Sequence, residues 1–115
     1  MRSLRPASLV AAFALLLVGC VSAKRQDQAG ARTGLGAAYL QEGNAPMAVA
    51  ELQKATKMDP RNWNAWNKLG LAYLAQAAPD RAEAAFRRAL KIAPDNAEVN
   101  NNYAYMLSRL GRYDE

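Results

Sequence analysis

The stretch from Trp66 to Pro94 decides the fold. It reads Trp66-Asn67-Lys68-Leu69-Gly70-Leu71-Ala72-Tyr73, then Ala82-Glu83-Ala84-Ala85-Phe86, then Pro94. Gly70 and Ala82 are small, which lets two helices approach closely, whereas Tyr73 and Phe86 are large enough to fill the remaining space. Proline does not continue a helix, so Pro94 ends the unit. The stretch therefore predicts two packed helices joined by a turn.

The same spacing occurs one unit earlier in the chain. Six pairs of matching residues are each separated by 34 positions: Leu35 and Leu69, Gly36 and Gly70, Tyr39 and Tyr73, Ala48 and Ala82, Ala55 and Ala89, Pro60 and Pro94. The match continues into a third unit, in which Ala104 follows Gly70, Leu107 follows Tyr73 and Gly111 follows Ala77. A repeat of this length indicates stacked units. We predict helices at about 31–42, 46–58, 63–76, 80–92 and 97–110, with positive φ at the helix ends near Gly43 and Gly111.

The order Trp66-x2-Leu69-Gly70-x2-Tyr73, Ala82-x3-Phe86, Pro94 resembles the tetratricopeptide repeat (TPR). The resemblance implies an all-α helical solenoid with two full repeats, 29–62 and 63–96, followed by the first helix of a third, 97–115. It also implies that Trp66 lies in the core, while Trp63 is less determined.

A third unit without its second helix would leave apolar side chains uncovered: Tyr103, Met106, Leu107 and Leu110. Repeat arrays usually end in a polar capping helix. We therefore expect this sequence to be part of a longer chain. The alternative is a short protein that dimerises through this edge.

Residues 1–19 have the composition of a secretory signal peptide. Arg2 and Arg5 precede an almost wholly apolar run from residue 7 to residue 18. This run is shorter than the about 20 residues that a transmembrane helix needs. Leu17-Val18-Gly19-Cys20 resembles the bacterial lipobox, which implies cleavage before Cys20 and a lipid on its sulfur. The alternatives are an ordinary secretory peptide and an uncleaved anchor.

Residues 20–28 comprise the cysteine and a polar stretch without periodicity, which we interpret as a tether reaching at most about 25–30 Å. In lipoproteins of this kind, an Asp after the cysteine favours the inner membrane. Val21 and Ser22 follow it here. The resemblance therefore implies the outer membrane, on its periplasmic face.

Composition excludes several kinds of function. The sequence has no histidine and one cysteine, so a zinc site of several His or Cys ligands and a histidine-based triad are ruled out. The formal charge is +5, and the cations are scattered except for Arg87, Arg88 and Lys91, which we interpret as a solvated helix face. We predict a protein that is not an enzyme, has no cofactor or metal, and binds neither nucleic acid nor a small-molecule substrate.

By resemblance to the TPR family, a protein partner binds the concave side, which the first helix of each unit lines. The residues expected there are Asn64, Asn67, Leu71, Asn101 and Tyr105. Asparagine amides offer a donor and an acceptor to a peptide backbone. Asn67 is the strongest candidate because asparagine has poor propensity in the middle of a helix. The alternative for Asn64 and Asn101 is local helix capping.

Some TPR domains hold a terminal carboxylate with basic residues on this side. The corresponding positions here are Thr33, Ala37, Lys68, Glu98 and Asn102. Only one of them is basic, so capture of a free carboxyl terminus is not supported.

The local sequence of two units resembles that of the type IV pilus biogenesis lipoproteins called pilotins. It includes residues 34–44, from Gly34 to Asn44, and Asn101-Asn102-Tyr103-Ala104 followed by Gly111-Arg112-Tyr113. The resemblance implies a scaffold that helps an outer-membrane secretin to assemble. A second possibility is a TPR lipoprotein adaptor for cell-wall enzymes or outer-membrane assembly factors. A third is a module joined to a catalytic domain beyond residue 115.

Overall fold

A computed structural model describes residues 6–112 of the chain. All regular structure in that range is helical, in five helices: α1 (Pro6–Gln41), α2 (Ala45–Met58), α3 (Trp63–Ala75), α4 (Pro79–Ile92) and α5 (Ala97–Arg109). The predicted all-α repeat fold is confirmed, and the bounds of α2 to α5 agree with the prediction within one residue. Arg2, Arg5 and residues 113–115 of the predicted third unit lie outside the described residues.

Each complete unit is a pair of helices that approach closely at one glycine. A Cβ atom added to Gly36 would lie 2.5 Å from Cγ of Leu52, and one added to Gly70 would lie 2.6 Å from Cε1 of Phe86. Leu52 and Phe86 are fully buried. The prediction that these glycines admit a large side chain from the second helix is therefore confirmed.

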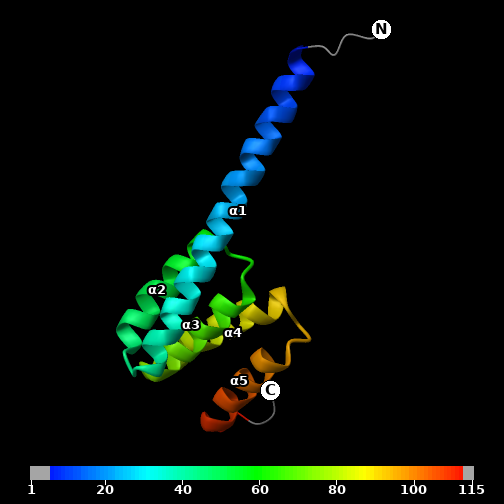
Figure 1. The fold of residues 1–115 in the computed structure, drawn as a ribbon. Helices are drawn as coiled ribbons and strands as arrows, with labels where there is room; N and C mark the ends of the chain where they lie inside the picture. The colour runs from blue at the N-terminus through cyan, green and yellow to red at the C-terminus, as the bar shows by residue number, and fades with distance from the viewer. Residues whose placement is uncertain (1–5, 113–115) are drawn as a thin grey trace.

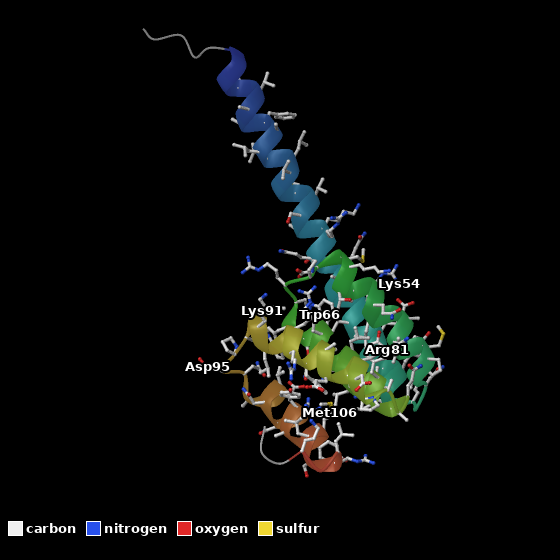
Figure 2. The ribbon with its side chains drawn as sticks, turned by 180° about the vertical axis from the view of Figure 1, so that it is seen from behind. Lys54, Trp66, Arg81, Lys91, Asp95 and Met106 are labelled. Carbon is white, nitrogen blue, oxygen red and sulfur yellow. The ribbon has the colours of Figure 1, made fainter. Side chains whose placement is uncertain are left out.

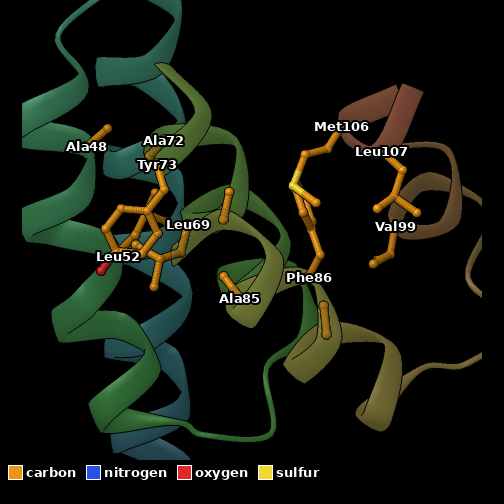
Figure 3. Close-up of a cluster of buried hydrophobic side chains, with 12 residues drawn as sticks. Ala48, Leu52, Leu69, Ala72, Tyr73, Ala85, Phe86, Val99, Met106 and Leu107 are labelled. Atoms are coloured by element: carbon orange, nitrogen blue, oxygen red, sulfur yellow. The ribbon is translucent and has the colours of Figure 1, made fainter. Parts of the chain in front are cut away.

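Each later unit packs on both helices of the preceding unit through its own first helix. α3 contacts α1 and α2, and α5 contacts α3 and α4, whereas the backbones of α2 and α4 do not come within 8 Å of each other. The odd-numbered helices therefore line one side of the stack and the even-numbered helices line the other. A continuous buried cluster joins α2 to α5 (Figure 3).

The third unit departs from our expectation. Met106 and Leu107, predicted to be uncovered, are buried, and Figure 3 shows them beside Phe86 and Val99. They lie on the face of α5 that packs against the second unit, so stacking alone covers them. Tyr103 is half-buried against the ring of Phe86, at 6.2 Å between centroids. Of the four, Leu110 is exposed.

The turns between units repeat one hydrogen bond with different side chains. Trp66 Nε1 donates to the carbonyl of Pro60 at 2.9 Å, and at the equivalent place Asn100 Nδ2 donates to the carbonyl of Pro94 at 3.0 Å. Trp66 is half-buried and packs against the core, so the predicted core position is correct, although one part of its surface remains open. Trp63 packs against the same cluster.

Three equivalent turn residues have positive φ. The values are 75° at Gly43, 55° at Ala77 and 71° at Gly111. The prediction for the two glycines is confirmed. Ala77 adopts the same left-handed conformation, although its Cβ makes that conformation costly.

Replacing Ala77 with glycine is expected to stabilise the protein. Relief of the left-handed alanine outweighs the greater freedom of glycine in the unfolded chain, so the free energy of unfolding should rise by about 0.5–1 kcal/mol. Urea denaturation followed by circular dichroism measures this. Ala104→Gly, at an exposed position inside α5, is the control and should lower it by about 1 kcal/mol. A loss of stability in Ala77→Gly would contradict the interpretation.

The first helix is much longer than predicted. α1 begins at Pro6 instead of about residue 31 and extends about 54 Å at the helical rise. Residues 21–28, which we expected to be an irregular tether, are helical, so they extend about 12 Å instead of 25–30 Å. No glycine or proline lies between Cys20 and Ala29, and Ala, Lys, Arg and Gln are good helix formers.

The amino-terminal part of α1 packs against nothing in the described chain. Every side chain from residue 9 to residue 28 is exposed, and Ala29 is the first buried residue. The helical stretch Leu9–Gln41 is long and apolar enough to cross a membrane, a property that a signal sequence near the N-terminus shares. In Figure 1 this part of α1 projects away from the stacked helices.

Glu83 connects α4 to α5 and to the segment that follows it. Its Oε1 accepts hydrogen bonds from Arg87 Nη2 at 2.7 Å and from the Tyr103 hydroxyl at 3.1 Å, and its Oε2 accepts one from Arg112 Nη1 at 2.8 Å. The bond from Arg112 is the largest cause that lowers the pKa of Glu83 from 4.5 to about 2; partial burial opposes it.

Acid should therefore loosen this connection. The pKa is lower in the folded chain than in the unfolded chain, so the stabilisation is present above pH 4.5 and is lost as the pH falls towards 2. Solvent screening keeps the expected loss to about 1 kcal/mol. Thermal unfolding across this pH range should show a smaller loss in Glu83→Gln than in the native protein, because the lowered pKa of Glu51 contributes to both. The exposed Glu42 supplies the control, since Glu42→Gln should retain the full pH dependence.

Candidate protein-binding groove

Two apolar hollows lie between neighbouring odd-numbered helices. The smaller, of about 260 Å³, is at the α1–α3 junction and is lined by Ala37, Leu40, Gln41, Lys68 and Leu71. The larger, of about 420 Å³, is at the α3–α5 junction and is lined by Leu74, Ala75, Ala77, Pro79, Tyr105, Met106, Arg109 and Leu110. Together they form what we call the groove. Hollows of this kind receive apolar side chains of a bound chain.

Two of the predicted contact residues line these hollows. Leu71 is half-buried in the wall of the smaller hollow, and Tyr105 is 57% exposed at the larger one. Asn64 is half-buried and Asn101 is exposed, and neither lines a hollow. The alternative of helix capping does not apply to them, because the side chains that cap α3 and α5 belong to Asn62 and Asn96.

Asn67, the strongest candidate, has a different role. Its side chain is fully buried. Its Nδ2 donates to Glu98 Oε1 at 3.0 Å, and its Oδ1 accepts from Asn102 Nδ2 at 3.1 Å. The amide therefore joins α3 to α5 and is not available to a peptide, so the predicted groove contact is wrong.

The physical reason is the position of Asn67 in its unit. Thirty-four residues earlier, Thr33 is also buried, and its hydroxyl donates to the carbonyl of Ala29 at 2.8 Å. In both units the next unit covers this position. Asn101 holds the same position in the third unit, where no described helix follows, and it is exposed.

Ion pairs occur beside the groove, at Lys68, and away from it, on α2. Lys68 Nζ lies 2.9 Å from Glu98 Oε1, which already accepts from Asn67. On α2, hydrogen bonds from Lys54 and then Arg32 lower the pKa of the Glu51 carboxyl. Lys68, the one basic residue among the positions compared with a carboxylate clamp, is therefore engaged by Glu98.

Arg109 and Leu110 line the groove, although neither was predicted from the sequence to contact a partner. Arg109 lies one helical turn after Tyr105, its guanidinium is 5.8 Å from the centre of the Tyr105 ring, and it borders the larger hollow. Arg109 could have been predicted to lie beside Tyr105, because residues four positions apart share a helix face. No group of three or more His, Cys, Asp or Glu residues that could hold a metal ion occurs among residues 6–112.

Stacked helix pairs with an open apolar groove define a helical-repeat protein of the kind that binds other polypeptides. Two family models, both described as tetratricopeptide repeat, match residues 33–97 and residues 85–115. The chain belongs to the tetratricopeptide repeat family. TPR domains generally act as non-catalytic scaffolds that bind protein partners.

Solved structures show the same fold. The chain is 34% identical to a structure titled as the functional characterization of Pseudomonas aeruginosa PilF, with a TM-score of 0.75 over 79% of this chain and 41% of that one. It is 30% identical to a point mutant of MamA, with a TM-score of 0.67 over 76% of this chain and 64% of that one. The chain therefore spans less than two thirds of either protein.

A third structure shares the fold at lower identity. It is the first TPR of Spaghetti (RPAP3) bound to an HSP90 peptide, at 20% identity and a TM-score of 0.69 over 73% of this chain and 68% of that one. No curated protein sequence matches the chain.

Proposed function

We propose that this protein is a pilotin: a TPR scaffold, anchored by a lipid on Cys20 to the periplasmic face of the outer membrane, that helps a pilus secretin to assemble. The observation that carries the proposal is the 34% identity to Pseudomonas aeruginosa PilF over 79% of the chain. The proposal adds to the shared fold a particular partner and a particular location.

The exposure of the first part of α1 supports a signal peptide that enters the membrane and is cleaved before Cys20, so that the lipid on Cys20 is the lasting anchor. Leu9, Phe13 and Leu16 are each more than half exposed and have no protein partner in the described chain. Apolar surface of this extent usually marks an interaction with a membrane or another protein. Cys20 is exposed at the end of this run as a free thiol, at the position where the lipobox resemblance puts the modified residue. Each buried methylene of an attached lipid adds about 0.8 kcal/mol of membrane affinity.

The groove supports recognition of a protein partner. Leu71 and Tyr105 belong to separate hollows on the same side of the stack, so a bound segment could place one apolar side chain in each. The ion pair of Lys68 and Glu98 lies between α3 and α5. This ion pair can contact the polar groups of a segment bound in the two apolar hollows.

The first experiment measures the fraction of pilus secretin that is multimeric in cells with and without this gene. Deletion should remove the multimers, and the intact gene should restore them. Cys20→Ser should release the protein from the outer-membrane fraction and fail to restore the multimers. Ser22→Ala, an exposed change two residues away, is the control and should behave as the native protein does.

The Tyr105→Ala variant separates partner binding from anchoring. It should stay in the membrane fraction, because Tyr105 is far from α1 in sequence and mostly exposed, yet restore fewer multimers. Normal multimers and pili in the deletion strain would reject the pilotin proposal and favour the adaptor for cell-wall enzymes. Co-sedimentation of Cys20→Ser with the outer membrane would reject the lipid anchor.

A further inference from the structure

A second recessed surface lies on the opposite side of the stack from the groove. It is a hollow of about 310 Å³ between α3 and α4, lined by Trp66, Leu69, Tyr73, Arg81, Ala84, Ala85 and Arg88. We call it the arginine notch. It is open because α2 and α4 do not approach each other, which leaves part of Trp66 and a small edge of the buried Tyr73 accessible between them. Figure 2, seen from behind, labels Trp66 and Arg81 on this side.

Two arginines are held over the aromatic rings of the arginine notch. The guanidinium of Arg88 lies 5.3 Å from the centre of the Trp66 ring, and that of Arg81 lies 5.9 Å from the centre of the Tyr73 ring. Within residues 6–112 neither arginine forms an ion pair, whereas the neighbouring Arg87 pairs with Glu83 at 2.7 Å. Arg87, Arg88 and Lys91 are all exposed on α4, in agreement with the predicted solvated helix face, but Arg87 contacts Tyr103 of α5 and Arg88 contacts Trp66 of α3.

The aromatic rings that hold the arginines are themselves fixed. The Tyr73 hydroxyl accepts a hydrogen bond from Gln53 Nε2 at 2.9 Å, and Trp66 Nε1 donates to the carbonyl of Pro60 at 2.9 Å. A stacked guanidinium uses its flat face and leaves its in-plane N–H donors free for a carboxylate. Each arginine over its ring therefore keeps N–H donors that can form a forked pair with an acid.

The spacing of the arginines defines what they can bind. Seven residues of α4 separate Arg81 from Arg88, which is about 10 Å along one helix face. Ala84 and Ala85 lie between them and leave apolar space. In a polyproline II conformation, with three residues per turn and a rise of about 3.1 Å per residue, carboxylates three positions apart lie on the same face with nearly the matching separation.

We propose that the arginine notch binds an acidic segment of a partner protein, in which two carboxylates about 10 Å apart each pair with one arginine. A small apolar side chain between the acids would lie against Ala84 and Ala85. The site lies on a different side from the groove and requires neither the lipid anchor nor a secretin partner.

The charge pattern favours a protein over the other polyanions. Nucleic acid binding usually depends on a broad basic surface, and a membrane surface attracts clusters of four to eight Lys or Arg. Here two unpaired arginines flank a short apolar floor, with the acidic side chains of Asp80 and Glu83 on the same helix.

The test uses the full chain in zwitterionic detergent micelles, with nitrogen-15 labelling. The probe is the blocked hexapeptide Gly-Glu-Leu-Ala-Glu-Gly, and its matched control has glutamine in place of both glutamates. Titration with the acidic peptide should shift the indole N–H signal of Trp66 much more than that of Trp63. The glutamine peptide should cause no shift at the same concentrations.

The variants assign the binding to the two arginines. Arg81→Gln with Arg88→Gln should raise the dissociation constant of the acidic peptide at least tenfold. Arg61→Gln with Lys91→Gln changes the net charge equally at exposed positions without ion pairs in the described chain, and it should change affinity less than twofold. Arg81→Lys with Arg88→Lys keeps the charge but loses the forked geometry, so it should give an intermediate loss.

Several results would overturn the proposal. Equal binding of the glutamine peptide, or an equal loss of affinity in the Arg61 and Lys91 variant, would show that the two arginines are not the site. A loss of affinity in Tyr105→Ala would place the peptide in the groove. A Trp66 shift with phosphatidylglycerol vesicles but not with the peptide would indicate a lipid surface. An unchanged helical circular dichroism spectrum shows that the variants are folded. The pilotin proposal can fail while this result stands, because the assay contains no secretin.

Discussion

Gly70→Ala is expected to lower the free energy of unfolding by about 2–3 kcal/mol. The added methyl would lie 2.6 Å from Cε1 and 2.8 Å from Cδ1 and Cζ of Phe86. Phe86 is fully buried and packs between α3 and α5, so its ring cannot swing into solvent. The helices must instead separate, and because Phe86 also contacts Tyr103, the loss should extend to the third unit.

Gly34→Ala is the matched control, because Gly34 is also inside a helix but an added Cβ meets nothing within 4 Å. It should raise stability by about 0.5–1 kcal/mol. Urea denaturation of both variants measures the difference. Phe86→Ala alone should cost about 3–5 kcal/mol, and the double variant should cost less than the sum, because the smaller side chain removes the clash. Strict additivity, or equal effects of the two glycine replacements, would show that the helices do not meet at Gly70 in this way.

Asn67→Ala is expected to lower the free energy of unfolding by about 2 kcal/mol and to loosen α5 selectively. The change removes the acceptor of Asn102 and one donor to Glu98, and it leaves a small cavity at a fully buried position. Hydrogen exchange should therefore accelerate in α5 before it accelerates in α2, which contacts α1 and α3 but not α5.

Asn101→Ala tests the same residue type at the equivalent position of the next unit. Asn101 is exposed, so the change in stability should stay within about 0.5 kcal/mol. A groove role for Asn67 would produce the opposite pattern, with unchanged stability and exchange but weaker partner binding. That outcome would restore the interpretation made from sequence alone.

The repeat fold could be predicted from sequence because its determinants are local and recur. Gly36 and Gly70, with Leu52 and Phe86, recur at fixed spacing, and Pro60 and Pro94 end each unit, so five helices could be placed before any contact was known. The start of α1 could not be predicted in this way. The helix passes through two stretches of different polarity, and no glycine or proline marks a boundary between Cys20 and Ala29.

The groove was predicted less well than the fold. Leu71 and Tyr105 were identified because they occupy repeat positions on the open side. Asn67 was misassigned because its position becomes buried only when the next unit stacks on it, and its partners Glu98 and Asn102 are more than 30 residues away in sequence. The stacking of Arg88 on Trp66 likewise depends on contact between two helices. Glu83, four residues earlier, indicates an ion pair for Arg87, but no local pattern predicts the contact of Arg88.

The unbroken course of α1 ties orientation to residue count. A flexible linker would let the stacked helices turn freely relative to the lipid anchor proposed at Cys20. In a continuous helix, each residue between Cys20 and Ala29 fixes an angle of about 100° and an advance of about 1.5 Å. One inserted residue would thus rotate the groove by a little over a quarter of a circle around the helix axis and change its distance from Cys20 by only about 1.5 Å. The number of helical residues between Cys20 and the stacked helices therefore sets the direction in which the binding surfaces face.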